Sequence, residues 1–489
     1  MTWRESRERM SYRPSPLALL VAGAFFMEFL DGSIIATALP RMAVSLHSSA
    51  VSLNVGISAY LLTVAVFILP SGWAAQRYGT RAVFATAVAV FTLGSVLCGF
   101  AGSATSFIAF RVLQGVGGAM MVPVGRLAVL RTTPKHKLIG AIAVLTWPGL
   151  TAPVLAPPIG GFLTVYASWR WIFFINVPLG IVAFLLALRL VPSGRGETRT
   201  PFDLLGFVLG ALACLAITRL LDLLGENGAP LTQPLLLMVA FCGSFAWLLH
   251  HIRHRAHPLI DLAPLGVATF RETLFGGGAM RMVIATMPFL LPLLFQLGFG
   301  MDAFHAGLLV IALFAGNIGI KPLTTPIIRR WGFREIFVAN GMLQAVTMLG
   351  CAMLGPATPV PVILILLVVS GASRSLQFTS INTLAYADVP ERMMSPANTM
   401  FSIAYQLSQG FGVALGAVAL RLATLATGSG ASVPGRAEFH FALIGLAVAM
   451  VLISLNALRL PPDAGNVVRS GKPAGDQKNA APPGVTSRR

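Results

Sequence analysis

The sequence predicts an all-α integral membrane protein of about fourteen transmembrane helices, built as two six-helix repeats joined by a two-helix insert. Three observations predict this fold: the composition of the 489 residues, the recurrence of long apolar runs, and an internal repeat. Hydrophobic residues make up 56% of the chain and charged residues 11%, whereas a typical soluble domain has roughly 25% charged residues. The composition therefore excludes the soluble globular classes.

Apolar runs recur along most of the chain, each of roughly 20 residues, the length that a helix needs to cross the hydrocarbon core. In chain order, the expected spans are 17–39, 51–72, 82–101, 106–130, 138–163, 171–191, 204–221, 232–251, 272–297, 304–325, 335–355, 360–382, 396–423 and 438–459. The fifth and ninth spans are the least regular because they are rich in Pro or Gly. Such breaks are tolerated where neighbouring helices or a cavity satisfy the freed backbone groups.

The positive charge sets the expected orientation. Most of the 35 Lys and Arg residues fall in the two tails and in alternate loops, and such loops lie in the cytoplasm. Both termini are therefore expected inside, in an inner (plasma) membrane of bacterial type. The net charge of +18 does not indicate nucleic acid, because it is spread over short loops.

An internal repeat divides the chain. The string Arg77-Tyr-Gly-Thr-Arg81 after the second span recurs as Arg330-Trp-Gly-Phe-Arg334 after the tenth, and Arg111-Val-Leu-Gln114 in the fourth span recurs as Arg374-Ser-Leu-Gln377 in the twelfth. We expect a cytoplasmic N-terminal tail at 1–16, a six-helix repeat at 17–191, a linker and two-helix insert at 192–271, a second six-helix repeat at 272–460, and a disordered cytoplasmic tail at 461–489.

Repeats of this kind are the architecture of secondary transporters, in which a site near the midplane lies between two halves that rock. The sequence contains no nucleophile, metal or cofactor constellation, and no phosphate-binding glycine loop. We therefore expect a transporter of a small molecule and not an enzyme. The driving force is expected to be a proton gradient, with no cofactor and no metal.

Two acids in the first span, Glu28 and Asp31, are the candidates for proton coupling. A carboxylate in hydrocarbon is costly unless it is protonated, paired or facing a wet cavity, so an intramembrane acid is a functional-site hypothesis by default. Asp31 is the preferred proton carrier and Glu28 the second candidate. The alternative for Asp31 is that it reaches interfacial water or caps the break at Gly32 and Ser33.

Several further polar residues within spans are expected to form a substrate cavity. Arg111 needs a partner in the membrane, and the nearest acids on the first span are Asp31 and Glu28. The expected cavity residues are Arg111, Gln114, Arg374, Gln377 and Arg281. For Arg281, snorkelling to the cytoplasmic interface is the alternative. Three arginines in a cavity would favour anionic or zwitterionic cargo.

Glycines and charges between spans suggest a gate. The expected gating-loop residues are Gly72, Arg77, Gly79 and Arg81, with Arg330, Gly332 and Arg334 in the second copy. The arginines would otherwise serve only as topology anchors. In the fifth span, Pro153, Pro157, Gly160 and Gly161 form a motif where backbones can approach and bend, which is also consistent with an ordinary packing kink.

These strings resemble the drug:proton antiporter branch of the major facilitator superfamily with about fourteen spans, the EmrB/QacA type. Residues 30–40, 72–81, 110–118 and 152–161 are similar to its first-span Asp, loop, fourth-span Arg and antiporter motifs, and 168–180 and 257–262 are also similar to this branch. Gln76 stands where the loop motif has Asp, and Ala152 and Ala156 where the antiporter motif has Gly. The resemblance implies a proton-coupled exporter of amphipathic cations, drugs or other toxic organics.

Other functions stay open at this point. A transporter of the same fold could take up or export a metabolite such as an organic anion, and a non-transporting receptor or assembly factor is the remote alternative. The expected partners are the small-molecule substrate and the lipid bilayer, with no nucleic acid. A periplasmic adaptor and an outer-membrane channel are left open.

Overall fold

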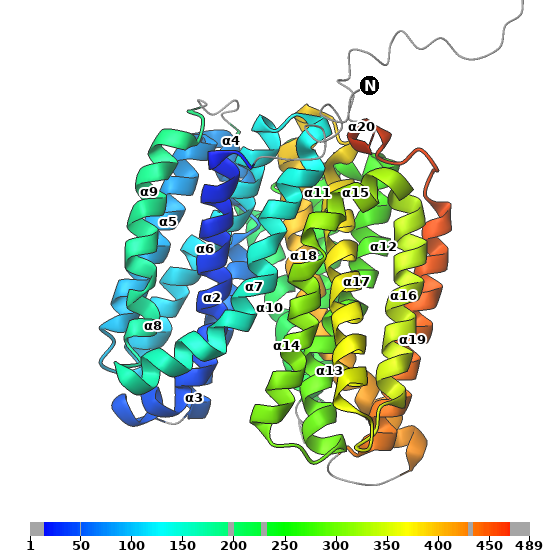
Figure 1. Ribbon diagram of the computed structural model, residues 1–489. Helices are drawn as coiled ribbons and strands as arrows, with labels where there is room; N and C mark the ends of the chain where they lie inside the picture. Colours follow the sequence, from blue (N-terminus) through cyan, green and yellow to red (C-terminus); the bar gives the residue numbers. More distant parts are fainter. Residues whose placement is uncertain (1–13, 49, 194–199, 226–231, 429–433, 470–489) are drawn as a thin grey trace, which may run out of the picture.

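The computed structural model describes residues 14–48, 50–193, 200–225, 232–428 and 434–469. The regular elements in these ranges are helices. Figure 1 shows two upright helix bundles side by side, one from the first part of the chain and one from the last. The prediction of an all-α membrane fold is confirmed.

The first bundle contains the helices α2 (Pro16–Ser45), α3 (Ala50–Phe67), α4 (Ser71–Tyr78), α5 (Thr80–Gly99), α6 (Ala104–Thr132), α7 (Leu138–Tyr166), α8 (Trp171–Phe174) and α9 (Asn176–Leu190). In it, α2 packs on α7, and α5 packs on α6 and α9. Local sequence sets the starts of its helices. The Ser15 hydroxyl accepts a hydrogen bond from the Ala18 amide at the start of α2, and Ser103 forms a capping box with Ser106 at the start of α6. Such caps satisfy amides that have no partner inside the helix.

The second bundle contains α12 (Ala268–Ala285), α13 (Met287–Leu293), α14 (Ala303–Gly319), α15 (Lys321–Trp331), α16 (Phe333–Met353), α17 (Val360–Ala387), α18 (Met394–Thr427) and α19 (Arg436–Asn456). In it, α12 packs on α18, α14 on α17, and α16 on α19. Between the bundles in the chain are α10 (Leu204–Gly225) and α11 (Thr232–His254), which pack on each other, and α10 also contacts α3 and α18.

The number of spans is close to the prediction. Within the described residues, 11 helices are long and apolar enough to cross a membrane, or 13 if each bent pair is one span. The apolar part of α10, Leu204–Leu220, is shorter than that length criterion. A count of fourteen requires α10 as a further span and stays a prediction.

The two bent pairs support the internal repeat. The helices α3 and α4 meet at 55°, and α14 and α15 meet at 54°. Each pair is followed by a glycine of positive φ, Gly79 at 85° and Gly332 at 89°. Because side chains disfavour this backbone region, glycine is the residue that makes the turn there. The second and tenth spans are therefore built alike.

The structure corrects the prediction of loops at these two positions. Residues Ser71–Tyr78 and Lys321–Trp331 are helical, and only the glycine that follows each helix turns the chain. No breaker stands between Ser71 and Gly79, so the helix runs until the first residue that favours another backbone conformation. The predicted gating loops are short helices.

The second repeated string lies at different depths in its two copies. Arg111 lies about two turns from the start of α6, whereas Arg374 lies about four turns from the start of α17. The similarity in spelling therefore does not correspond to equivalent heights in the two bundles. Arg374 lies closer to the middle of its helix.

The bundles are joined at the end where α4 and α15 lie. Between α6 and α7, in the 3₁₀ turn η1 (Lys135–Lys137), Lys135 donates hydrogen bonds to the carbonyl oxygens of Tyr386, Ala387 and Val389, at 2.8, 2.9 and 2.8 Å. Arg329 of α15 donates to the His136 carbonyl oxygen at 3.1 Å. These contacts link the first bundle to the end of α17 in the second.

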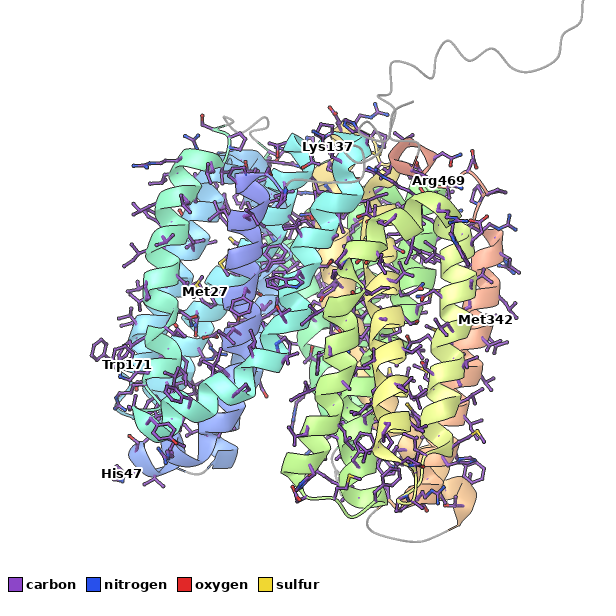
Figure 2. All side chains as sticks on the ribbon, viewed as in Figure 1. Met27, His47, Lys137, Trp171, Met342 and Arg469 are labelled. Carbon is purple, nitrogen blue, oxygen red and sulfur yellow. The ribbon has the colours of Figure 1, made fainter. Side chains whose placement is uncertain are left out.

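The C-terminal segment corrects the prediction of a tail that is disordered from residue 461. The short helix α20 (Asn466–Arg469) lies at this same end, where Figure 2 labels both Lys137 and Arg469. Val468 is fully buried, and Arg469 donates to the carbonyl oxygens of Arg329 and Arg330, both at 3.1 Å. Two contacts order this segment: the buried side chain of Val468, and the hydrogen bonds by which Arg469 caps the C-terminus of α15. Residues 470–489 lie outside the described residues, as do 1–13 of the predicted N-terminal tail.

Asp203 ties the segment after α11 to the start of α10. Its carboxylate accepts hydrogen bonds from the amides of Gly206 and Leu259, at 3.1 and 3.2 Å, and lies 2.9 Å from His251 Nε2. Burial alone would raise the pKa of Asp203, but these hydrogen bonds stabilise the charged form and the net effect is a lowered pKa. The carboxylate therefore stabilises this junction when it is ionised.

We expect Asp203→Asn to flatten the acid dependence of stability. Since the pKa is lowered on folding, the stabilisation is complete above the ordinary aspartate pKa of about 3.9, and it is lost as the pH falls through the lowered value. Thermal unfolding in detergent between about pH 5 and about pH 3 checks this. The exposed Asp463→Asn is the matched control, and a wild-type acid dependence in Asp203→Asn would contradict the assignment.

Candidate functional site

A buried ion pair lies inside the first bundle. Arg111 Nη1 of α6 donates to Asp31 Oδ2 of α2 at 2.6 Å, and both side chains are fully buried. Gln114, one helical turn from Arg111, donates to Asp31 Oδ1 at 2.9 Å. The structure therefore brings together three residues that the sequence singled out, with the pairing of Arg111 and Asp31 that the cost of an intramembrane charge predicts.

Three other residues complete this network and were missed by sequence reasoning. Asn176, at the start of α9, donates to Asp31 Oδ1 at 3.0 Å and to Ser95 Oγ of α5 at 2.9 Å. The Tyr60 ring of α3 lies 4.0 Å from the Arg111 guanidinium carbon. A neutral polar residue in an apolar span does not by itself indicate a functional site. Asn176 could have been noticed because it lies within the 168–180 string. The Asp31 carboxylate is thus held by donors from two other helices and faces neither interfacial water nor a helix cap.

Glu28 lies one turn before Asp31 on α2 and has different surroundings. Its Oε2 is buried without a hydrogen-bond partner. It is near enough to Asp31 and to Arg126 to interact with both charges. A methyl group at Gly118 would lie 3.7 Å from its carboxyl group and 3.0 Å from the Tyr60 hydroxyl, so the glycine leaves room beside this acid. Glu28 lies between the ion pair and the interface of the two bundles.

A small cavity lies between the bundles. Its lining residues are Phe25, Phe29, Arg126, Leu145, Thr146, Gly149, Arg374, Phe378, Asn382, Tyr405 and Gln409. They come from α2, α6 and α7 of the first bundle and from α17 and α18 of the second. The volume is about 40 Å³, which accommodates water but not a drug-sized molecule, since such sites occupy roughly 300–1,000 Å³.

The predicted cavity residues divide into two groups. Arg374 lines the cavity, and Arg281 lies 4.9 Å from the ring of Tyr405, which also lines it. Arg281 is buried, with 1% of its surface exposed, so it does not snorkel to the membrane surface. The two guanidiniums come from α12 and α17, and both lie at the bundle interface on the side of the second half.

The other three predicted cavity residues are corrected by the structure. Arg111 and Gln114 point into the first bundle, where Asp31 binds them. Gln377 lies inside the second bundle, accepting from Asn340 at 2.7 Å. Each has a polar partner within its own bundle, although Nε and Nη2 of Arg111 are buried without one.

The predicted gating residues lie near the end of the molecule where the two bundles are joined. A methyl group at Gly72 would lie 3.6 Å from Ser395 Oγ of α18 and closer still to the Thr399 hydroxyl, so Gly72 permits close approach of the two bundles. Arg81 Nε donates to the Val191 carbonyl oxygen at 2.6 Å, which is a contact inside the first bundle. Gly79 and Gly332 make the turns described above, and Arg330 is exposed while Arg77 and Arg334 are half-buried. Of these residues, Gly72 contacts the other bundle.

The predicted antiporter motif lies in α7, which is a continuous helix. Ala152 and Ala156 are fully buried against α2 in a cluster with Ile34 and Ile35, so small side chains do mediate close packing. At Gly161, however, an added methyl group would meet nothing within 4 Å, which corrects the expectation of close approach there. Pro153 is half-buried and Gly160 is buried, and the side chain of Pro157 lies outside the described residues.

Two bundles with matching bends and glycine turns, an ion pair buried in one and a polar cavity between them are the construction of a secondary membrane transporter. The chain belongs to the Major Facilitator Superfamily, whose family model matches residues 21–413. It is therefore a multi-pass membrane transporter and not an enzyme. The predicted superfamily is confirmed.

Curated relatives cover nearly the whole chain. "Putative multidrug resistance protein MdtD" of Citrobacter koseri is 38% identical over 452 residues, 91% of this chain and 94% of the relative. The protein of that name from Enterobacter sp. (strain 638) is 37% identical over 459 residues, with 93% and 96% covered. The narrower EmrB/QacA type with about fourteen spans is not decided by these matches and stays a prediction.

Solved structures share the fold. The proton:xylose symporter XylE, bound to 6-bromo-6-deoxy-D-glucose, has a TM-score of 0.61 at 15% identity, covering 93% of this chain and 97% of that chain. The Escherichia coli fucose:proton symporter FucP has a TM-score of 0.59 at 13% identity, covering 91% and 99%. At these identities the likeness concerns the fold alone.

Proposed function

We propose that this transporter is a proton-coupled antiporter that exports drugs or other toxic organic compounds by alternating access. The observation that carries the proposal is the buried Asp31–Arg111 pair inside the first bundle. The names of the MdtD relatives, which are 37–38% identical, support export of toxic compounds. No cofactor enters the proposal, because the proton gradient is the driving force.

Asp31 is the proposed proton carrier. Its charge is stabilised by Arg111, Gln114 and Asn176, so protonation would weaken all three contacts at once and free the guanidinium. The first bundle would then have one arrangement with Asp31 charged and another with Asp31 protonated. A transporter that alternates between two states needs such a pair of arrangements. Glu28 lacks such donors and is the proposed second proton position, between Asp31 and the cavity.

The orientation is part of the same proposal. Lys and Arg gather at the end where α4, α15 and η1 lie, so this end is assigned to the cytoplasm and both termini with it, in an inner membrane. The bundles, joined at this end, would then be in a state closed to the cytoplasm. In this proposal the two moving halves are residues 17–191 and 272–460. Residues 192–271 form the linker and the two-helix insert.

Proton-driven accumulation in inverted vesicles tests the function. We expect wild-type vesicles to accumulate a dye from a panel that includes both cations and anions, and to lose the dye when the proton gradient collapses. Asp31→Asn at matched abundance should lose this accumulation, because the carboxylate that binds the proton is gone. The exposed Asp463→Asn is the control. Equal activity in Asp31→Asn would move proton coupling to Glu28, and no proton-dependent movement of any dye would refute the proposed function.

Export across two membranes would involve a periplasmic adaptor and an outer-membrane channel. Cross-linking in intact cells followed by purification tests for both. The proposal itself requires only the substrate and the bilayer.

A further inference from the structure

Four cationic side chains gather at the interface between the bundles. They are Arg126 of α6, Arg281 of α12, Lys321 of α15 and Arg374 of α17. The three arginines are buried, with 9%, 1% and 8% of their surfaces exposed. Lys321 crosses the interface, donating to Thr146 Oγ1 of α7 at 2.8 Å and to Thr379 Oγ1 of α17 at 3.1 Å. The interface therefore concentrates positive charge in the middle of the molecule.

These cations have neutral neighbours. The guanidinium of Arg281 lies 4.9 Å from the rings of Phe401 and Tyr405 and 3.5 Å from Asn382 Oδ1, and its Nε has no hydrogen-bond partner. Arg374 lies 5.2 Å from the Phe378 ring, and both its Nε and Nη1 are buried without a partner. Aromatic faces attract cations, but they do not satisfy N–H donors in the plane of the guanidinium.

Carboxylates do not balance this charge. In the part of the chain that the structure describes, none forms an ion pair with Arg126, Arg281 or Arg374, and Asp31 is already bound to Arg111. Glu28 interacts with Arg126 only at longer range. A buried cation without a counter-charge costs several kcal/mol, so an anion that enters the interface would be bound strongly.

We propose that the transported substrate is an organic anion with an aromatic or apolar body, whose carboxylate or phosphate-like group binds between Arg126 and Arg374. The planar guanidinium matches these groups with paired hydrogen bonds. Arg374 lines the cavity together with Arg126, and two of its buried donors have no partner. Phe25, Phe29 and Phe378 supply the apolar surface. This inference rests on the proposed transport function and specifies its cargo.

The position of the two arginines also connects binding to movement. Arg126 belongs to the first bundle and Arg374 to the second, so one anion between them would draw the two halves together. Without it, their like charges repel. The anion would therefore favour the closed arrangement of the bundles, whereas a cation at the same place would meet repulsion from both sides.

Two dyes with the same three-ring body and opposite charge test this inference: fluorescein, an anion, and a cationic rhodamine. Binding to the purified protein in detergent is measured by fluorescence anisotropy. We expect wild type to bind fluorescein more tightly than the rhodamine. Arg374→Gln and Arg126→Gln should each weaken fluorescein binding by about tenfold or more, through lost charge-assisted hydrogen bonds. The exposed Arg271→Gln on α12 is the matched control, and Arg374→Lys should keep part of the affinity because it keeps the charge.

Tighter binding of the rhodamine, no binding of fluorescein by wild type, or unchanged fluorescein binding in both glutamine variants would overturn the inference. Size-exclusion profiles confirm that each variant is folded. Failure of the two proposals can be told apart. Proton-driven accumulation of the rhodamine without fluorescein binding would refute the anionic cargo and leave the antiporter intact. Fluorescein binding with no proton-dependent transport would refute the antiporter and leave the anion site.

Discussion

Arg111→Gln is expected to abolish transport and to lower the amount of folded protein in the membrane. The substitution leaves the carboxylate of Asp31 buried without its cation, since Asp31 has 1% of its surface exposed. Removing one partner of a buried ion pair typically costs about 3–5 kcal/mol. Gln114 and Asn176 would still donate to Asp31, but amides do not supply the lost charge. Membrane abundance, thermal unfolding in detergent and proton-driven transport are the measurements.

The double variant separates folding from transport. Asp31→Asn combined with Arg111→Gln removes both charges, and neutral replacement of a buried pair is often tolerated. We expect it to regain abundance and thermal stability while transport stays absent. Arg189→Gln, an exposed arginine on α9, is the matched control. A double variant as unstable as Arg111→Gln would mean that the uncompensated charge is not the cause of the instability.

The pairing of Asp31 with Arg111 was predictable because a charge within an apolar span must find a counter-charge, and few were available. Ser95 and Tyr60 were not predictable in the same way. A neutral hydroxyl in a membrane helix costs little and can bond to its own backbone, so its presence in a sequence does not indicate a partner. Their contribution depends on how α3 and α5 pack around α6, which is a property of the tertiary structure.

The spans themselves follow from hydropathy, since each must cross the same apolar thickness. What hydropathy does not contain is the bend. The breaks after Phe67 and after Gly319 lie beside Pro70 and Pro322, at the starts of α4 and α15, where proline interrupts the helical hydrogen bonds. The matching spelling of the strings at Arg111 and Arg374 also does not fix their depth, since Arg111 lies about two turns from the start of α6 and Arg374 about four turns from the start of α17. Arg374 lines the cavity, whereas Arg111 is bound by Asp31 inside its own bundle.

Lys135→Met is expected to shift the protein away from the state closed at the proposed cytoplasmic end. Lys135 donates to the carbonyl oxygens of Tyr386, Ala387 and Val389, which are otherwise left without donors at the end of α17. A hydrogen bond from a charged group contributes about 1.5–3 kcal/mol. Because Lys135 is half-buried and water competes for its contacts, we expect Lys135→Met to destabilise the closed state by about 2 kcal/mol in total. That corresponds to a shift of roughly thirtyfold in the equilibrium between closed and open states.

The shift has a direction because the carbonyl groups that lose Lys135 are buried. Tyr386, Ala387 and Val389 have at most 1% of their surfaces exposed, so their oxygens can regain partners only if the bundles part and admit water. A cysteine placed at Ser395, which is buried beside Gly72 at this end, reports that opening in a background without the four native cysteines. Its reaction with a membrane-impermeant maleimide in inverted vesicles should be faster in Lys135→Met by about tenfold or more. Lys137→Met is the control, since Lys137 is exposed in the same turn. Unchanged labelling in Lys135→Met would mean that other contacts, such as that of Arg329 with the His136 carbonyl oxygen, hold this end closed without it.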